Sequence, residues 1–451
     1  MPQHLIAIFG GAVSGAEAAW QLAQANISSV VFDQNALPYG KIEDGLPKWH
    51  AKLRDKEEEA INEKLSHPLV HFVPKIRLGK DVHFEDIHQH WGFTAILLAT
   101  GAWNDRPLAI ENIADFKGKG LYYQNDFMYW FNHYHEPDYS GPQMECSDGA
   151  LVVGGGLASV DVCKALMILN VEKALKEKGI EEDIFSLERS IAKVLEKHHT
   201  SLEDLGVKPC TLVYRRRIKD MPLYPGPTDT PEELEKAEGI REKIIQLAMD
   251  KYLFEILPNH VAIDKLTRDG RLDGLILRET KSVNGKLEEI PGTDKKFHAP
   301  LVVSSIGSIP EEIPGIPWKG SVFEVNECEC CRIKGYENVF ALGNAVTGRG
   351  NIKESMAHGR TITQTLSEQY LFDPEENLAG QLRDKEATVE GNISNLLQQF
   401  HPLNPPKETS RIATLKKVEA LQKMVGYDGD FKKWIERNKP TRLEEILGKY
   451  H

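Results

Sequence analysis

Two apolar runs, each followed by a glycine cluster and then by a helical pattern, constrain this chain more than any other feature. The first run, Leu5–Phe9, leads into Gly10, Gly11 and Gly15. A strand, a glycine turn and a helix N-terminus together aim backbone N–H groups at an anion such as a diphosphate. The segment therefore predicts a dinucleotide-binding unit, in which Gly10 makes the tight turn and Gly15 allows close packing of helix on strand.

Three further residues belong to the same prediction. Ala12 stands where the fingerprint usually has its second glycine, and Ser14 lies in the first turn of the expected helix. Asp33 follows the apolar run Ser29–Phe32, where an acidic side chain accepts hydrogen bonds from a ribose hydroxyl. The alternatives are a strand–turn–helix without a ligand and a surface aspartate at a strand end.

A second glycine motif begins at the apolar run Ala150–Val153, and its pattern is Gly-x-Gly-x-x-Ser. Its candidate contacts with a second dinucleotide are Gly156, Leu157, Ala158 and Ser159. The next expected strand, Thr211–Tyr214, ends in Arg215 and Arg216 rather than in an acid. Arginines at this place offer charge-assisted bonds to the 2′-phosphate of NADP. The alternative is a solvated basic cluster.

The composition excludes several classes of protein. The chain has 451 residues, 27% of them charged, and a formal net charge of −12, which argues against nonspecific nucleic-acid binding. No apolar run approaches the roughly 20 residues of a membrane span, and no basic segment typical of a signal peptide precedes the first strand. Six cysteines in so long a chain do not suggest a disulfide framework, so we expect a cytoplasmic setting.

Two other groups of residues invite a metal interpretation. His133 and His135 alternate in an aromatic-rich segment, and Cys328, Cys330 and Cys331 include a C-x-x-C spacing. Neither group has the second pair of ligands that a structural zinc site needs, so no metal is predicted. Neither glycine motif carries a cysteine pair, which argues against a disulfide relay.

The loop after Asp33 identifies a family. Pro38-Tyr39-Gly40, Gly45 and His50 follow it at the distances seen in the adrenodoxin-reductase-like branch of ferredoxin–NADP reductases. The chain resembles these flavoproteins, which are related to the small subunit of glutamate synthase. Lys41 stands where that family has a flavin-contacting leucine, and Asp44 replaces an aromatic residue.

The resemblance covers about residues 5–370 and implies further contacts with FAD. Leu78 precedes a Gly-Lys-Asp-Val segment, and Ala95–Gly101 ends in the turn that passes the cofactor. A return strand leads to Gly343 and to a loop, after which a helix over 354–371 points its N-terminus at the flavin. The implied FAD contacts in these segments are Gly40, Lys41, Leu78, Thr100, Gly101, Gly343, Asn344, Gly350, Asn351, Ile352 and Lys353.

The predicted fold class is α/β, with two Rossmann-like dinucleotide-binding domains and a helical C-terminal extension. The FAD domain is discontinuous, and the NADP domain is inserted into it. The predicted ranges are 1–106 and 323–372 for the FAD domain, 107–322 for the NADP domain and 373–451 for the extension. A charged helical insertion over 171–207 and a hairpin at Asn284-Gly285 are expected in the second domain.

The resemblance implies that NADPH reduces bound FAD and that electrons then pass to a ferredoxin-like iron–sulfur protein, or in the reverse direction. His50 is the candidate for tuning the flavin edge, with Glu233 as a partner on the nicotinamide side. Two alternatives stay open. One is an electron-input subunit like the glutamate synthase small subunit, although the cysteine-rich segment that usually precedes it is not seen. The other is a redox sensor that binds flavin or nucleotide without catalysis.

Overall fold

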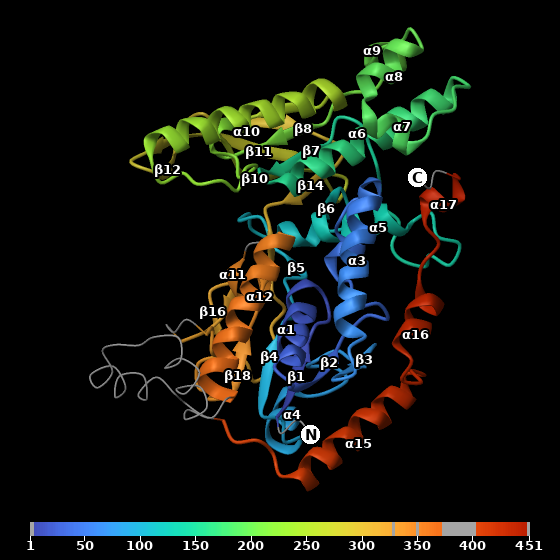
Figure 1. Cartoon of the computed structure of the whole chain (residues 1–451). Helices are drawn as coiled ribbons and strands as arrows, with labels where there is room; N and C mark the ends of the chain where they lie inside the picture. The colour runs from blue at the N-terminus through green and yellow to red at the C-terminus, as the bar shows by residue number, and fades with distance from the viewer. Residues whose placement is uncertain (1–3, 327–329, 349–350, 372–402, 449–451) are drawn as a thin grey trace. The chain divides into compact units, whose positions relative to one another are not determined.

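The computed structural model describes residues 4–326, 330–348, 351–371 and 403–448 (Figure 1). The chain forms two compact units. Unit 1 comprises residues 1–43, 51–104 and 309–442, and unit 2 comprises residues 44–50, 105–308 and 443–451. Each unit is built around its own parallel sheet, and each is described separately below.

The sheet of unit 1 has five parallel strands in the order β18-β4-β1-β2-β3. The strands are β1 (Leu5–Phe9), β2 (Ser28–Phe32), β3 (Val70–Val73), β4 (Ala95–Leu98) and β18 (Val339–Ala341). Every residue of β1, β2, β4 and β18 is buried, as expected for a parallel sheet that is covered on both faces. The continuous apolar runs in the sequence are explained by this burial.

Helices α1 (Val13–Gln24), α3 (Ala51–Leu65) and α12 (Ile352–Leu366) belong to unit 1. An ion network joins all three, because the buried carboxylate of Glu17 on α1 accepts from Lys64 at 2.7 Å and from Arg360 at 2.7 Å. The remaining elements are α2 (Lys41–Asp44), α4 (Phe84–His90), β16 (Trp318–Lys319), β17 (Val322–Phe323), α11 (Asn344–Thr347) and a π-helical turn at Ser367–Leu371.

The C-terminal extension folds onto unit 1 as α15 (Glu408–Met424) and α16 (Phe431–Asn438). Gln422 of α15 donates to the carbonyl of Phe72 on the edge strand β3 at 2.7 Å. Thr414 donates to the carbonyl of Trp91. The rings of Phe72 and Phe431 meet edge to face at 5.2 Å, so both helices share the core of this unit.

The sheet of unit 2 also has five parallel strands, in the order β6-β14-β7-β8-β9. They are β6 (Leu121–Tyr123), β7 (Leu151–Gly154), β8 (Thr211–Val213), β9 (Glu255–Leu257) and β14 (Val302–Ser305). An antiparallel sheet adds β10 (His260–Arg268), β11 (Arg271–Val283), β12 (Lys286–Glu289) and β13 (Lys295–His298). The hairpin predicted at Asn284-Gly285 is confirmed, because both residues have positive φ between β11 and β12.

Helices α5 (Gln124–His133), α6 (Leu157–Glu177) and α10 (Pro231–Tyr252) are the long helices of unit 2. The insertion predicted over 171–207 is helical: α6 ends within it, and three short helices follow. The shorter elements are 3₁₀ turns at Lys48–His50, Ile113–Phe116 and Ile218–Asp220, with α7 (Ile184–Arg189), α8 (Ile191–Lys197), α9 (Leu202–Leu205) and α17 (Leu443–Ile446). Strands β5 (Asn104–Asp105) and β15 (Ser308–Ile309) lie where the chain passes from one unit to the other.

The predicted fold class is confirmed, with two Rossmann-like units and a helical C-terminal region. The predicted boundaries differ from the two units mainly at residues 44–50, 309–322 and 443–448. Residues 44–50 group with unit 2, where Asn132 bonds to the backbone of both Leu46 and Lys48. Residues 309–322 group with unit 1, where Ile313 and Ile316 join an apolar cluster on the sheet. As functional domains, the predicted ranges stay a prediction.

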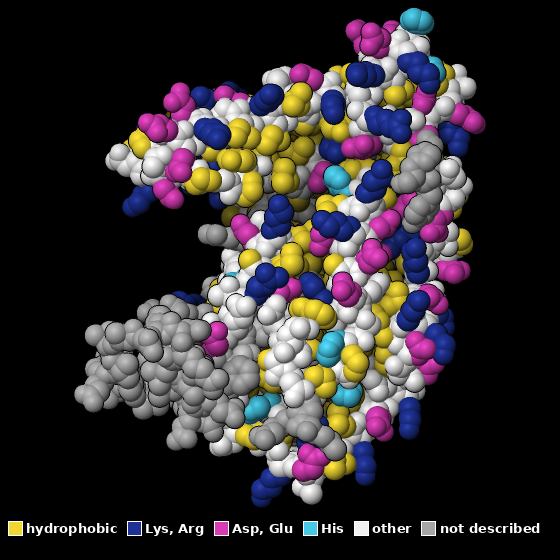
Figure 2. Space-filling model, in the orientation of Figure 1, with side chains coloured by type: hydrophobic (Ala, Val, Ile, Leu, Met, Phe, Trp, Pro, Cys, Tyr) yellow, Lys and Arg dark blue, Asp and Glu magenta, His cyan; other side chains and the backbone are white. Residues whose placement is uncertain are grey.

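The surface mixes charges of both signs. Figure 2 shows lysine and arginine side chains interspersed with aspartate and glutamate over the visible face of both units. No helix in the described part of the chain combines the length and the apolar character that crossing a membrane requires.

Candidate cofactor sites

The carboxyl edge of the unit 1 sheet brings the first set of predicted residues together. Phe9 pairs with Phe32 and with Leu98, and Leu98 pairs with Ala341. The chain therefore leaves four neighbouring strands at one edge, which is where doubly wound sheets bind ligands. The predicted residues that follow those strand ends are Gly10, Asp33, Thr100, Gly101, Gly343 and Asn344.

Backbone geometry requires glycine at the turn after β1. Gly10 has φ of +105°, and a Cβ atom there would lie 2.3 Å from the carbonyl oxygen of Ala99. A Cβ atom on Gly15 would lie 1.8 Å from the carbonyl oxygen of Gly10. The Asp33 carboxylate accepts from the N–H of Gly11 at 2.7 Å and from the N–H of Asn35 at 2.8 Å. Asp33 is thus fixed beside the turn.

The segment Pro38–Lys41 lies directly over this turn. A Cβ atom on Gly40 would lie 3.0 Å from the methyl carbon of Ala12, and one on Gly11 would lie 2.7 Å from the Cβ of Pro38. Ala12, which caps α1 without a side-chain bond, therefore faces the loop. The ammonium of Lys41 lies 5.9 Å from the ring centre of Trp103.

The return strand β18 closes the same edge. Gly343 has φ of +60°, and a Cβ atom there would lie 2.6 Å from Oγ of Ser14. Its N–H donates to Nδ1 of His358 at 3.0 Å, a contact that no motif in the sequence indicated. Asn351 caps α12, since its side chain accepts from the N–H of Glu354 at 2.8 Å, and Ile352 and Lys353 form the first turn. Leu78 is buried in an apolar cluster, and Gly350 lies outside the described residues.

Two buried polar atoms at this edge test whether FAD fits. Oγ1 of Thr100 and Oδ1 of Asn344 have no hydrogen-bond partner among the described residues. Buried polar groups are nearly always paired in folded proteins. Both residues were predicted to contact FAD, so the unpaired atoms fit a site that a polar ligand completes.

Removing these atoms has opposite effects on the free and the loaded protein. Thr100→Val and Asn344→Leu each delete a buried unpaired group, so we expect the apoprotein to unfold at the same or a higher temperature. Each variant loses one bond to the ligand, so FAD should bind about three- to tenfold more weakly. Titration of the apoprotein with FAD measures the affinity, and thermal unfolding measures the stability.

Ser29→Ala is the matched control, because Oγ of Ser29 is also buried without a described partner but lies inside strand β2. It should leave FAD affinity unchanged. Equal affinity for all three variants would contradict the assignment of Thr100 and Asn344.

The unit 2 sheet presents a second edge of the same kind. Val153 pairs with Val213 and with Ser304, so the second glycine turn and the arginine segment leave neighbouring strands together. Gly156 is the N-cap of α6, and nothing lies within 4 Å of a Cβ built there. Ser159 donates to the carbonyl of Gly156 at 2.6 Å, which fixes the turn. The ring of Tyr214 covers Gly155, where a Cβ atom would lie 2.1 Å from it.

The three arginines after β8 differ in their partners. Arg217 pairs with Asp220 at 2.7 Å and with Glu238 at 3.3 Å. Arg215 and Arg216 form no ion pair with any described residue, and Arg215 is exposed. Their backbone is fixed, since the carbonyl of Arg215 accepts from Thr280 and that of Arg216 from the N–H of Asn259. Two unpaired guanidinium groups beside a helix N-terminus fit an anion such as a 2′-phosphate.

The two predicted catalytic residues both lie in unit 2. His50 ends the 3₁₀ turn Lys48–His50, and burial together with the charge of Lys164 lowers the pKa of its imidazole. Glu233 forms a capping box at the start of α10: its carboxylate accepts from the N–H of Thr230 at 3.1 Å, and its own N–H donates to Oγ1 of Thr230 at 3.2 Å. Local helix capping therefore accounts for Glu233, and its catalytic role stays a prediction.

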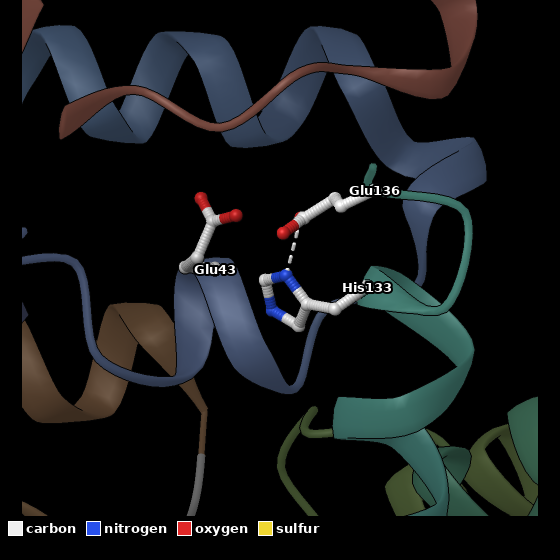
Figure 3. Close-up of side chains that lie close together, drawn as sticks. All are labelled: Glu43, His133 and Glu136. Atoms are coloured by element: carbon white, nitrogen blue, oxygen red, sulfur yellow. Dashed lines mark hydrogen bonds and ion pairs between the residues drawn. The ribbon is translucent and has the colours of Figure 1, made fainter. Parts of the chain in front are cut away.

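His133 takes part in ion pairs. Its Nδ1 lies 2.6 Å from Glu136 (Figure 3), and its Nε2 lies 3.2 Å from Asp44. Burial lowers the pKa of His133, but the two carboxylates outweigh it and raise the pKa to about 9. A doubly protonated imidazole donates from both ring nitrogens, which suits a pair of carboxylates.

The raised pKa of His133 predicts a pH-dependent stability. The pKa lies above the unfolded value of roughly 6.5, so the stabilisation is fully present below that pH and is lost as the pH rises through about 9. His133→Gln should be less stable than the wild type at pH 6, by up to about 3 kcal/mol, and the difference should shrink by pH 9.5. Urea unfolding at both pH values measures it, and a constant difference would contradict the ion-pair assignment.

Among the described cysteines, Cys146, Cys163 and Cys210 form no disulfide. Burial raises the pKa of the Cys146 thiol to about 12 and that of Cys163 well above its usual value, which makes both poor nucleophiles. Cys331 lies with its sulfur 3.7 Å from Nε2 of His358. Cys328 lies outside the described residues. The prediction that the C-x-x-C segment holds no metal therefore stays a prediction.

Comparison with known proteins agrees with this geometry. Residues 4–214 match the family described as pyridine nucleotide-disulphide oxidoreductase. The chain is 25% identical over 376 residues to the glutamate synthase [NADPH] small chain of Bacillus subtilis, covering 81% of this chain and 68% of that protein. It is 26% identical over 235 residues to the mitochondrial NADPH:adrenodoxin oxidoreductase of Arabidopsis thaliana, covering 48% of this chain and 45% of that protein.

The fold has a solved counterpart. FprA of Mycobacterium tuberculosis, determined in complex with NADPH, superimposes with a TM-score of 0.63 and 18% identity over 92% of this chain and 91% of FprA. The resemblance to adrenodoxin-reductase-like flavoproteins and to the glutamate synthase small subunit, predicted from the loop after Asp33, is thus confirmed.

Proposed function

We propose that this chain is an FAD-dependent NADPH oxidoreductase that passes electrons to a ferredoxin-like iron–sulfur protein, or in the reverse direction. One observation carries the proposal. The central strand of each unit ends in a glycine turn, and the charged side chains beside the two turns have opposite signs. Asp33 stands beside the first, and the unpaired Arg215 and Arg216 stand beside the second. An acid suits a ribose hydroxyl, and arginines suit a 2′-phosphate.

The residues of unit 1 bind and orient FAD in this proposal. The turn Gly10–Gly15 and the N-terminus of α1 receive the diphosphate, and Asp33 receives the adenosine ribose. Thr100 and Asn344 donate or accept at the buried edge, while the positive end of α12 favours negative charge on the reduced cofactor. When bound, FAD accepts a hydride and releases single electrons, a chemistry that belongs to the cofactor.

The residues of unit 2 bind NADPH. The N-terminus of α6 at Gly156 and Leu157 receives the diphosphate, and Arg215 and Arg216 select NADPH over NADH through the 2′-phosphate. His50 is proposed as a neutral positioning group, consistent with its lowered pKa. Glu233 acts as the partner of His50 when its carboxylate gives up its hydrogen bond to the N–H of Thr230.

An external one-electron acceptor suits this chain better than a disulfide relay, because neither glycine motif holds a cysteine pair. The broader part of the proposal is that the chain is an oxidoreductase. The specific part is that its electron acceptor is a ferredoxin. A cytoplasmic setting, expected from the use of cysteine, belongs to the same proposal.

A second candidate is the electron-input role of a glutamate synthase small chain, favoured by the similarity to the Bacillus subtilis protein over 81% of this chain. One assay separates the two. The purified protein is supplied with NADPH and cytochrome c, with and without a bacterial ferredoxin. Ferredoxin-dependent reduction of cytochrome c supports the reductase. In a parallel reaction, ferricyanide replaces cytochrome c and ferredoxin as the electron acceptor. Reduction of ferricyanide by NADPH, together with no ferredoxin-dependent reduction of cytochrome c, favours the input subunit.

A further inference from the structure

The loop that covers the first glycine turn is attached at both ends to the C-terminal extension. This loop, residues 36–43 and hereafter the cover loop, begins just after Asp33 and includes Pro38 and Gly40, which touch the turn at Gly11 and Ala12. Its fixation therefore controls the shape of the proposed FAD site.

The first attachment is made by Trp434 of α16. Its indole N–H donates to the carbonyl of Ala36 at 2.6 Å. The side chain is 2% exposed, and its ring meets Tyr427 edge to face at 5.4 Å. The ammonium of Lys75 lies 5.4 Å from the same ring, so the indole is held firmly against the start of the cover loop.

The second attachment is made by Arg442. Its guanidinium binds both carboxylate oxygens of Glu43, with Nη2 at 2.6 Å from Oε2, and the same Nη2 lies 2.8 Å from Glu58 on α3. Arg442, Glu43 and Glu58 are all less than one-tenth exposed. A planar fork bound to two carboxylates fixes direction as well as charge.

A local contact completes the arrangement. Tyr39, in the middle of the cover loop, donates its hydroxyl to Asn62 of α3 at 3.0 Å. The contacts at the two ends come from the C-terminal extension, which lies more than 390 residues farther along the chain. Neither contact lies in the predicted cofactor set, so their effect on FAD is exerted through the loop.

We propose that the C-terminal extension is a positioning element for the flavin site, in which Trp434 and Arg442 hold the cover loop over the glycine turn. The inference rests on the proposed FAD site. FAD affinity should therefore depend on these two side chains although neither touches the cofactor.

The experiment compares FAD affinity with thermal stability in full-length variants. Arg442→Met removes the guanidinium that binds the buried carboxylate of Glu43 and leaves Glu58 with the more distant Arg54, at 3.6 Å, so it should lower the unfolding temperature and weaken FAD binding at least tenfold. The triple variant Arg442→Met, Glu43→Leu, Glu58→Leu removes the guanidinium together with the two carboxylates that it binds, while Arg54 keeps its pair with Asp55 at 2.9 Å. Replacing a buried charged group by apolar side chains restores stability in known cases. The hydrogen bonds from Arg442 that orient Glu43 at the end of the cover loop remain absent.

The triple variant should therefore regain the wild-type unfolding temperature while FAD still binds at least tenfold more weakly. Trp434→Phe, which removes a single N–H donor and keeps a ring, should weaken FAD binding severalfold. Lys433→Gln is the control, because Lys433 is on the same helix and pairs with Asp430, the N-cap residue of that helix. It should change neither quantity.

Two results would overturn the inference: FAD affinity that recovers together with stability in the triple variant, or unchanged affinity in both Arg442→Met and Trp434→Phe. A wild-type protein that binds no FAD would instead refute the proposed function. The two failures are therefore distinguishable.

Discussion

Replacing both Arg215 and Arg216 by glutamine is expected to raise KM for NADPH about a hundredfold or more, while KM for NADH stays close to that of the wild type. Each charge-assisted bond to a phosphate contributes about 1.5–3 kcal/mol, and NADH has no 2′-phosphate to lose. Neither side chain forms an ion pair with a described residue, so no internal partner is left without its charge. Steady-state kinetics with both nucleotides measure the change.

Arg217→Gln is the matched control. Arg217 is the adjacent arginine, but Asp220 and Glu238 already occupy its guanidinium. The substitution should change KM for NADPH less than about threefold, since exposed ion pairs contribute little. An Arg217 effect as large as that of the double variant would show that general positive charge, and not a specific phosphate site, governs affinity.

Gly15→Ala is expected to abolish FAD binding and to destabilise unit 1 by about 3 kcal/mol or more. A Cβ atom on Gly15 would lie 1.8 Å from a backbone oxygen, that of Gly10. Relief requires α1 to move away from the strand, which opens the turn that receives the diphosphate. Bound flavin after purification and urea unfolding of the apoprotein measure the two effects.

The control is again a glycine inside a helix. Nothing lies within 4 Å of a Cβ built on Gly239 of α10. Gly239→Ala should stabilise the protein by up to about 1 kcal/mol, because alanine favours the helix. Normal flavin content in Gly15→Ala would show that the turn does not hold the diphosphate.

The sequence allowed prediction of those parts of the sites that depend on local chemistry. Gly10 and Gly15 are required by backbone contacts, and Asp33 and Arg215 follow from where a parallel strand ends. The hairpin at Asn284-Gly285 needs positive φ at both positions. Each of these is encoded within a few neighbouring residues.

The start of α10 has a local sequence signal that explains Glu233. Thr230-Pro231-Glu232-Glu233 has the pattern of a capping box with proline at the first helical position. That pattern predicts the start of α10, and it gives the Glu233 carboxylate a structural task. The nicotinamide-side role of Glu233 is implied by the family resemblance alone.

The remaining contacts are nonlocal and could not be predicted. Trp434 bonds to Ala36 across 398 positions of sequence, and Arg442 bonds to Glu43 across 399. His358 bonds to Gly343 from a separate helix. Nothing in the surrounding residues specifies such partners, because they arise only when the extension folds onto the sheet. For the same reason, the unit to which residues 44–50 belong is known only from the structure.

We propose that one chain holds FAD beside Asp33 and takes its electrons from NADPH at Arg215 and Arg216. The most direct test is the visible absorption spectrum of the purified protein under anaerobic conditions, recorded before and after equal additions of NADPH and NADH. We expect a yellow protein whose flavin absorption is bleached, and bleached faster by NADPH than by NADH. A colourless protein that takes up no FAD, or a yellow one bleached faster by NADH, would contradict it.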